Sequence, residues 1–272
     1  MIWRVIGVVS AAALVLAELS ARLARMVAEV PGAPSWPWYA VWIAAATVVL
    51  VGMLERRAPL FGRVFWRGAA DRRLVAITFD DGPSAAYTSA ILDILREHEV
   101  KATFFVLGVN AQRHPELVTR AAREGHDVGN HGFDHRVLPL GGPRFVRDQI
   151  ARTSDIIERL TGTRPTLFRA SHGWRNPWVN GVARQQGCRV VGWTLGVWDT
   201  DRPGAGVIAG RTLIGARNGC VLLLHDGRGI EPAPDASQVV HALPSIIAGL
   251  RERGYELVTL SSLIRQTEQP LS

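Results

Sequence analysis

Runs of apolar residues alternate with amphipathic segments along the chain from residue 74 onward. Short runs rich in β-branched and aromatic residues predict buried strands, whereas apolar residues spaced three and four apart predict helices. The predicted strands are residues 74–78, 102–107, 127–130, 166–169, 189–195, 221–224 and 256–260. The predicted helices are residues 87–98, 115–124, 145–160, 177–186, 207–216 and 238–253. This alternation predicts an α/β fold with about seven parallel strands, either a barrel or a doubly wound sheet.

The first 57 residues follow a different pattern. Residues 36–54 contain no charged residue, are rich in aromatic residues at their start, and precede Arg56 and Arg57. This run has the length, aromatic belt and basic flank of a membrane span, with a buried core helix as the alternative. A shorter apolar run, residues 2–19, lacks a convincing signal-peptide cleavage site and is expected to be a second, retained span.

Two spans would form a membrane anchor of residues 1–57, joined by a linker, residues 58–73, to the α/β domain. The expected location is a bacterial-type cytoplasmic membrane, and the arginines after the second run favour a cytoplasmic domain. If the first run is cleaved or merely interfacial, the side of the membrane stays open.

The positive charge of the chain does not indicate nucleic-acid binding. The formal net charge is +7, but Lys101 is the single lysine among 31 basic residues, which indicates a general bias toward arginine. No nucleic-acid-binding motif accompanies this charge, so no nucleic-acid partner is expected. The two cysteines, Cys188 and Cys220, are too few for a disulfide scaffold and are expected to be buried free thiols, although neighbouring strands would allow a bridge.

Polar residues follow the predicted strands. Asp80 and Asp81 lie in Thr-Phe-Asp-Asp-Gly-Pro directly after the first strand, and His225 ends the apolar run Leu-Leu-Leu-His. The carboxyl ends of parallel strands meet at one edge of the fold, where α/β proteins build their sites. The other residues expected at this edge are His131, His135, Arg169 and Asp199.

The spacing of His131 and His135 indicates a metal site. Two histidines four apart on a helical turn share one face, and with one carboxylate they leave positions open for water and substrate. Zinc is the expected ion, although cobalt, manganese or iron also suits these ligands. A histidine pair by itself is more often incidental, but here it follows a strand end in a chain that also offers Asp80 and Asp81. A lone histidine such as His225 is often structural, but Asp199 is available to hold its tautomer for acid catalysis.

Five motifs along the chain resemble, in their order, those of the polysaccharide deacetylases with a NodB homology domain, carbohydrate esterase family 4. They are residues 78–83, 131–135 and 168–174, Asp199, and residues 223–225. The resemblance covers about residues 74–263 and implies a distorted (β/α) barrel of the NodB type, here residues 74–266 with a tail at 267–272. It implies that Asp80 is the general base, paired with Arg169, and that His225 is the general acid. Asp199 matches the aspartate of the family's fourth motif.

The resemblance also implies the metal and substrate contacts. Asp81, His131 and His135 would be the metal ligands, the backbone N–H of His172 would help to hold the oxyanion, and Leu223 would form a wall for the acyl methyl group. The chain departs from the family pattern at Ala170 and Ser171, where prolines are usual, at His172, where tyrosine is usual, and at Thr200, where tryptophan is usual. Trp193 or Trp198 would have to replace that aromatic platform.

The expected function is metal-dependent removal of an N-acyl group, N-acetyl above all, from an amino sugar in a polysaccharide, oligosaccharide or lipid-linked saccharide. The expected partners are a carbohydrate or glycolipid substrate and membrane lipid, with no obligate protein partner. One alternative is a deformylase or amidase that acts on a glycolipid or a non-sugar amide. Another is a non-catalytic carbohydrate-binding membrane protein, which the presence of every expected ligand, base and acid disfavours.

Overall fold

The structure is a computed structural model that describes residues 36–55 and 59–269, with side chains omitted for residues 36–41 and 59. The chain divides into two units, Met1–Val51 and Gly52–Ser272. The first predicted span, residues 2–19, and the basic pair Arg56 and Arg57 lie outside the described residues.

The second predicted span coincides with a helix, α2 (Trp36–Leu54). Its described part exposes large apolar side chains, namely Trp42, Ile43, Val48, Val49 and Val51. Within the described residues, however, no helix combines the length and the apolarity needed to cross a membrane. The membrane anchor predicted for residues 1–57 is therefore not supported by this part of the chain.

The larger unit is built on one curled sheet, in which eight strands within the described residues pair in parallel. The strands are β1 (Leu74–Asp80), β2 (Thr103–Val106), β3 (Asp127–Asn130), β4 (Leu167–Phe168), β5 (Arg189–Val190), β6 (Leu195–Gly196), β7 (Cys220–His225) and β8 (Glu256–Val258). Their order is β5-β4-β3-β2-β1-β7-β6, with β8 beside the first half of β1. The predicted parallel α/β fold is confirmed in this curled form.

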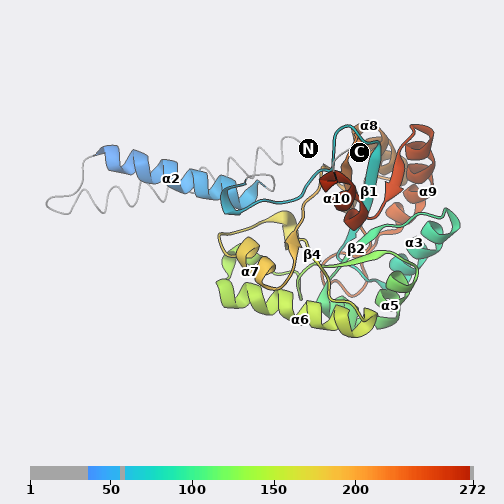
Figure 1. Cartoon of the computed structure of the whole chain (residues 1–272), viewed down its shortest axis with the longest axis horizontal. Helices are drawn as coiled ribbons and strands as arrows, with labels where there is room; N and C mark the ends of the chain where they lie inside the picture. Colours follow the sequence, from blue (N-terminus) through green and yellow to red (C-terminus); the bar gives the residue numbers. More distant parts are fainter. Residues whose placement is uncertain (1–35, 56–58, 270–272) are drawn as a thin grey trace. The chain divides into compact units, whose positions relative to one another are not determined.

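Helices follow one another around the outside of the strands (Figure 1). They are α3 (Ala85–Glu97), α4 (Gly108–Arg113), α5 (Pro115–Arg123), α6 (Pro143–Thr161), α7 (Val179–Gln185), α8 (Ala205–Gly215), α9 (Ser237–Glu252) and α10 (Leu260–Glu268). Short 3₁₀ turns are η1 (Pro59–Phe61), η2 (Leu138–Leu140), η3 (Ser171–Gly173) and η4 (Asp199–Asp201). The helix α6 shows how sequence sets these bounds, because Pro143 begins it and Gly162, at φ 73°, ends it.

The central strand β1 is buried along its whole length. Successive side chains of a strand point to opposite faces, so β1 contributes to two cores. Val75, Ile77 and Phe79 pack in the larger core, whereas Leu74 and Ala76 pack in a second core on the opposite face of the sheet, to which α10 also contributes. This double burial explains why β1 reads as a continuous apolar run.

The single strand predicted for residues 189–195 is wrong. The structure has β5 and β6 at opposite ends of the strand order, so the chain between them crosses the gap where the curled sheet does not close. Backbone bonds explain the division, because Gly192 N–H donates to the Phe65 carbonyl, whereas Thr194 N–H donates to the Val221 carbonyl on β7. Phe65 and Trp66, predicted as part of a linker, thus pair with the chain that crosses this gap.

The predicted strand at residues 256–260 is too long. Strand β8 ends at Val258, and Thr259 caps α10 by accepting a hydrogen bond from the Ser262 N–H with its side chain. A threonine before a helix favours the start of that helix. The short apolar pattern of residues 256–260 did not reveal this helix start. The helices α4 and α10 were not predicted.

Candidate active site

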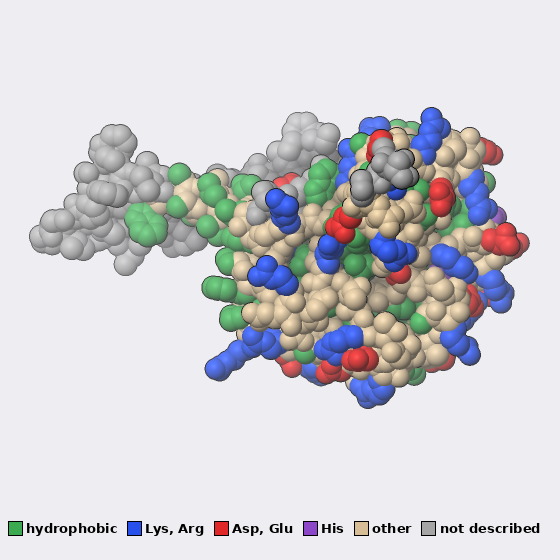
Figure 2. Space-filling model, viewed as in Figure 1, with side chains coloured by type: hydrophobic (Ala, Val, Ile, Leu, Met, Phe, Trp, Pro, Cys, Tyr) green, Lys and Arg blue, Asp and Glu red, His purple; other side chains and the backbone are tan. Residues whose placement is uncertain are grey.

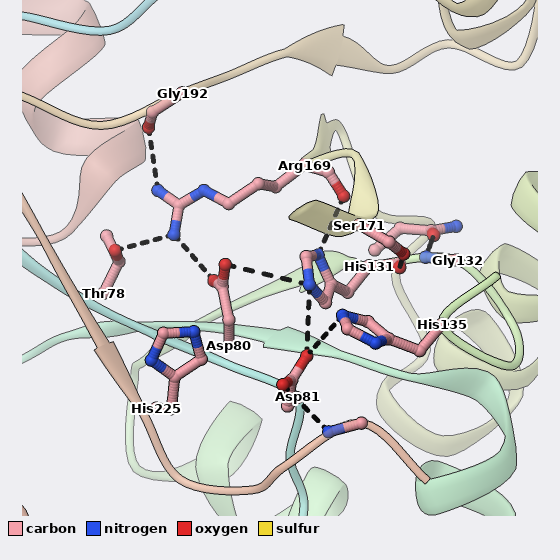
Figure 3. Close-up of polar contacts among 12 residues, drawn as sticks. Thr78, Asp80, Asp81, His131, Gly132, His135, Arg169, Ser171, Gly192 and His225 are labelled. Carbon is pink, nitrogen blue, oxygen red and sulfur yellow. Dashed lines mark hydrogen bonds and ion pairs between the residues drawn. The ribbon is translucent and has the colours of Figure 1, made fainter. Parts of the chain in front are cut away.

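A cavity of about 610 Å³ lies at the carboxyl ends of the strands, the edge where the sequence predicted a site. Asp80 and His225, the last residues of β1 and β7, are direct neighbours in the parallel register. Asp81, His131 and His135 line the same cavity, as do Asp199, His172 and Leu223, and Arg169 lies behind Asp80. The structure therefore brings all nine predicted site residues together (Figure 3 shows six of them).

Three side chains form a cluster suited to a metal ion. The carboxylate Oδ1 of Asp81 lies 3.3 Å from Nε2 of His131 and 3.1 Å from Nε2 of His135. Two ligands bound tetrahedrally at ~2.0–2.1 Å would lie about 3.3 Å apart, so these separations match a zinc-sized ion. Among the described residues, these three side chains form the one group whose donor atoms lie this close together.

The hydrogen bonds around the cluster leave Asp81 Oδ1 and His131 Nε2 available to bind an ion. Asp81 Oδ1 is buried without a hydrogen-bond partner in the described structure, an arrangement that is costly unless an ion occupies the space beside it. The Nδ1 of His131 lies 2.8 Å from the Arg169 carbonyl, so the tautomer that donates this bond presents the Nε2 lone pair to the cluster. One carboxylate oxygen and two imidazole nitrogens fit a zinc site with an open position.

Burial and neighbouring charges shift the pKa values of Asp81 and His135. Burial raises the pKa of Asp81, but the adjacent His131 outweighs burial and lowers it overall. Burial lowers the pKa of His135 to about 4. Both groups therefore stay in the deprotonated form that binds metal ions at neutral pH.

The histidines do not lie on a helical turn, so that part of the sequence interpretation is wrong. Residues 131–135 form a loop after β3, in which His135 has φ 60°. Polar bonds replace the helical ones, because Gly132 N–H donates to Asn130 Oδ1 and Phe133 N–H donates to Gln149 Oε1. The two rings still converge, with centroids 5.5 Å apart.

Asp80 is held by a buried arginine (Figure 3). Arg169 Nη1 donates to Asp80 Oδ1 at 2.7 Å and to Thr78 Oγ1 at 2.8 Å, while Nη2 donates to the Gly192 carbonyl at 2.9 Å. This ion pair is almost fully buried. Because Oδ1 is bound to the arginine, Oδ2 is the oxygen of Asp80 that remains for proton transfer, 3.8 Å from His131 Nε2.

Asp199 orients His225 twice. Its Oδ2 accepts the backbone N–H of His225 at 2.8 Å, and both of its oxygens lie 3.1 Å from His225 Nδ1. Burial lowers the pKa of His225, but the charge and hydrogen bond of Asp199 outweigh burial and raise it to about 10. His225 is thus a cation at neutral pH, the state a general acid needs.

Asn110, on α4, is a site residue that sequence reasoning missed. Its Nδ2 group donates to the carbonyls of Asp81 and Gly229, both at 2.8 Å, and Gly229 N–H donates to Asp81 Oδ2 at 2.9 Å. The three bonds form a closed ring that engages Oδ2 and leaves Oδ1 free. No motif signals this role, because Asn110 lies in the unpredicted helix α4 and Gly229 in a loop.

The rim of the cavity carries aromatic side chains. Trp198, with φ 57°, is 45% exposed and lines the cavity beside Thr200. The His172 ring packs against that of His135, with centroids 4.4 Å apart, and Trp193 also lines the cavity, with its ring against Gly173. Two tryptophans thus face the cavity although Thr200 itself is not aromatic.

Comparisons with known proteins identify what the chain is similar to. A family model described as polysaccharide deacetylase covers residues 67–191. A peptidoglycan-N-acetylglucosamine deacetylase of Bacillus cereus is 34% identical over 218 residues, which cover 78% of this chain and 98% of the relative. A chitooligosaccharide deacetylase of Rhizobium leguminosarum bv. trifolii is 35% identical over 213 residues, which cover 76% of this chain and 99% of the relative.

The similarity extends to three dimensions. A crystal structure of a peptidoglycan N-acetylglucosamine deacetylase, bound to a hydroxamate-type benzamide, superposes with a TM-score of 0.70 at 36% identity. The match covers 74% of this chain and 92% of that structure. The resemblance inferred from the motifs is therefore confirmed by sequence and by fold.

Proposed function

Because the chain belongs to the polysaccharide deacetylase family, we propose that it hydrolyses the N-acetyl amide of an amino sugar within a saccharide chain. The relatives named above are deacetylases of peptidoglycan and of chitooligosaccharides, which supports an N-acetylglucosamine unit as the substrate. The products would be acetate and a sugar with a free amine.

One observation carries the proposal. Asp80 and His225 end adjacent strands in direct register, and the cluster of Asp81, His131 and His135 lines the same cavity. A base, an acid and a metal-binding group thus surround one space, which is the arrangement that amide hydrolysis requires. The same groups would be unnecessary in a protein that only binds carbohydrate.

The base acts first. A divalent cation held by Asp81, His131 and His135, with Zn²⁺ the best fit to this donor set, would supply a Lewis acid that activates water and polarises the amide carbonyl. Asp80 takes a proton from the attacking water, whose oxygen forms the new bond to the carbonyl carbon. Arg169 keeps the Asp80 carboxylate oriented for this transfer.

The acid completes the reaction. The backbone N–H of His172 donates to the oxygen that becomes negative, and Leu223 lies against the acetyl methyl group. His225 then gives its Nε2 proton to the nitrogen as the carbon–nitrogen bond breaks, because an amine anion is a poor leaving group. Asp199 keeps that proton available by raising the pKa of His225.

Acetate release tests the proposal. The full chain would be incubated with N-acetylated chitooligosaccharides, peptidoglycan and lipid-linked amino sugars, with chelator and then with added zinc. We expect release that needs the metal, and Asp80→Asn or His225→Ala should lower turnover ~10²–10⁴-fold because each removes a proton-transfer group. Formate release from formylated substrates would distinguish a deformylase.

Matched variants control for nonspecific damage. Asp201→Asn and His241→Ala replace exposed residues of the same types outside the cavity, and each should keep wild-type turnover. Wild-type acetate release by Asp80→Asn or His225→Ala would disprove the assigned roles. Release from none of the substrates by protein with bound zinc would contradict the proposed function.

A further inference from the structure

Three large apolar side chains protrude from one region of the larger unit. Leu140 in η2 is 86% exposed, Leu60 in η1 is 48% exposed, and Trp178 at the start of α7 is 46% exposed. Figure 2 shows hydrophobic side chains that project at the edge of the unit where Figure 1 places α7. Leu60, Leu140 and Trp178 are called the Leu140 patch below.

Asn176 joins two members of the patch. Its Nδ2 donates to the backbone carbonyls of Pro139 and Gly141, on either side of Leu140. Its Oδ1 accepts the backbone N–H of Trp178. Asn176 is 3% exposed, so this buried amide holds the Leu140 turn against the start of α7.

Leu60 belongs to the same surface. The backbone N–H of Arg175 donates to the Met53 carbonyl, and Arg175 Nη1 donates to the Gly62 carbonyl. Asn180, on α7, donates its Nδ2 to the Arg63 carbonyl. Met53, Gly62 and Arg63 therefore lie beside residues 175–180, and the Leu60 side chain lies against Gly52.

Two arginines border the patch. Arg63 lies three residues after Leu60, and its backbone carbonyl accepts a hydrogen bond from Asn180 on α7. Arg144 lies in the first turn of α6, four residues after Leu140. Both are exposed, and neither guanidinium has a carboxylate partner among residues 36–55 and 59–269. Exposed leucine and tryptophan side chains beside unpaired cations are the composition of surfaces that enter the headgroup region of a bilayer.

We propose that the Leu140 patch docks onto the surface of an anionic lipid bilayer. Apolar side chains in the patch would enter the boundary between headgroups and acyl chains, and Arg63 and Arg144 would contact anionic headgroups. The chain enters the patch at residues 52–54, the end of the apolar helix α2, so the patch continues an apolar stretch of the sequence. A surface that contacts only water would not be expected to expose leucine and tryptophan side chains beside arginines.

Docking would place the cavity close to the bilayer surface. The loop between β4 and α7 carries His172 into the cavity and, six residues later, Trp178 into the patch. A saccharide presented near the membrane would thus reach the cavity while the patch is bound. The docking itself does not depend on the deacetylase activity proposed above.

A fluorescent probe at residue 140 tests the proposal. In the full chain, Leu140→Cys would be labelled with an environment-sensitive maleimide dye, because Cys188 and Cys220 are both buried. The matched control is Ile214→Cys on α8, a helix that packs against α9, where the native isoleucine is 80% exposed. Each labelled protein would be mixed with vesicles of phosphatidylcholine alone or with one part phosphatidylglycerol in about three, a charge density that attracts basic residues.

We expect a blue shift of the dye at residue 140 in anionic vesicles and none at residue 214. Arg63→Gln with Arg144→Gln should abolish the difference between anionic and neutral vesicles. An unchanged dye at residue 140, or equal shifts at both positions, would overturn the proposal. A blue shift without vesicles that grows with protein concentration would indicate that a second copy of the chain covers the patch. A dye already shielded in dilute protein would indicate that residues 1–35 cover it. Either result would also overturn the proposal.

Discussion

Four residues around the cavity have backbone conformations that L-amino acids seldom adopt. Asp81, His135, His172 and Trp198 have φ between 57° and 73°, and all four line the cavity. Such a conformation costs of order 1–3 kcal/mol and persists only where the surrounding structure enforces it. In Asp81 and His135 it brings Oδ1 and Nε2 within 3.1 Å of each other, and the same conformation in His172 and Trp198 is expected to serve the cavity as well.

Trp198 should bind the face of a sugar ring. Trp198→Ala should raise KM for chitooligosaccharides about tenfold, a loss of ~1.4 kcal/mol, because the aromatic surface contacts substrate and transition state alike. The value of kcat should change little. Steady-state kinetics on soluble oligosaccharides measures both constants, with Trp178→Ala as the control that leaves both unchanged. A fall in kcat at constant KM would exclude a ring-binding role.

Asp199 should set the pH range of the reaction. The Asp199→Asn variant removes the charge that raises the pKa of His225, whereas burial, which lowers this pKa, remains. The acid form would then be lost at a lower pH, so the alkaline limb of kcat/KM should move down by ~1–3 pH units. A bound cation lowers the pKa in both proteins, so the direction is the same. Profiles of kcat/KM against pH that coincide would show that Asp199 does not govern the acid.

The gathering of the candidate site residues could be predicted from sequence because strand ends meet at one edge. Asp80 and His225 follow apolar strands, and this position alone brings them together. The conformations of His135 and Trp198 could not be predicted, because left-handed backbone is expected of glycine and asparagine rather than of these residues. The packing of neighbouring elements determines them.

At the scale of elements, the loop after β7 closes the cavity. Arg228, Gly229, Ile230 and Glu231 line its wall, and Asn110 on α4 ties this loop to the end of β1. Elements far apart in the sequence thus orient one carboxylate, that of Asp81. If Asp81 holds a metal ion as proposed, loss of such a bond typically lowers metal affinity about 10–100-fold.

Asn110→Ala should weaken metal binding about 10–100-fold, because the closed ring around Asp81 loses two of its three bonds. Titration of the metal-free protein with Co²⁺ would measure the affinity, and the absorption spectrum would report the geometry. Asn180→Ala is the matched control, since it removes a side-chain bond to the Arg63 carbonyl instead. Equal affinity and an unchanged spectrum in Asn110→Ala would show that the ring does not position Asp81.

Long helices and buried strands could be predicted, whereas short elements could not. The pattern over residues 145–160 is long enough to show its period, and the structure has α6 there. Strands β5 and β6 have two residues each, and their apolar sequence reads as one run. Only the bonds to Phe65 and Val221, which are distant in sequence, reveal that they belong to opposite ends of the sheet.

At the scale of the molecule, the cluster of Asp81, His131 and His135, which we propose holds a metal ion, joins two strand ends of the sheet. Asp81 follows β1, and the loop with His131 and His135 follows β3. An ion that binds the folded chain alone stabilises it by ~2.7 kcal/mol at a hundredfold excess over Kd. Because ~1 kcal/mol shifts Tm by about 2–4 °C in a domain of this size, chelation should lower Tm by about 5–10 °C.

Thermal unfolding with and without chelator measures this effect. His131→Ala should have a lower Tm than the wild type in zinc and should not respond to chelator, because it lacks a ligand. His241→Ala, an exposed residue on α9, should respond like the wild type. A wild-type Tm that is independent of chelator, in protein shown to bind zinc, would contradict this coupling.

The gap in the curled sheet has a consequence for how the protein can be shortened. Phe65 N–H donates to the Val190 carbonyl, the Phe65 carbonyl accepts Gly192 N–H, and the Trp66 carbonyl accepts the Thr194 hydroxyl. A chain trimmed to begin at residue 74 would leave the Val190 carbonyl and the Gly192 N–H without these partners at an edge of the sheet. Unpaired strand edges of this kind recruit other chains. Such a trimmed protein should self-associate, whereas one that begins at residue 59 should stay monodisperse at the same concentration.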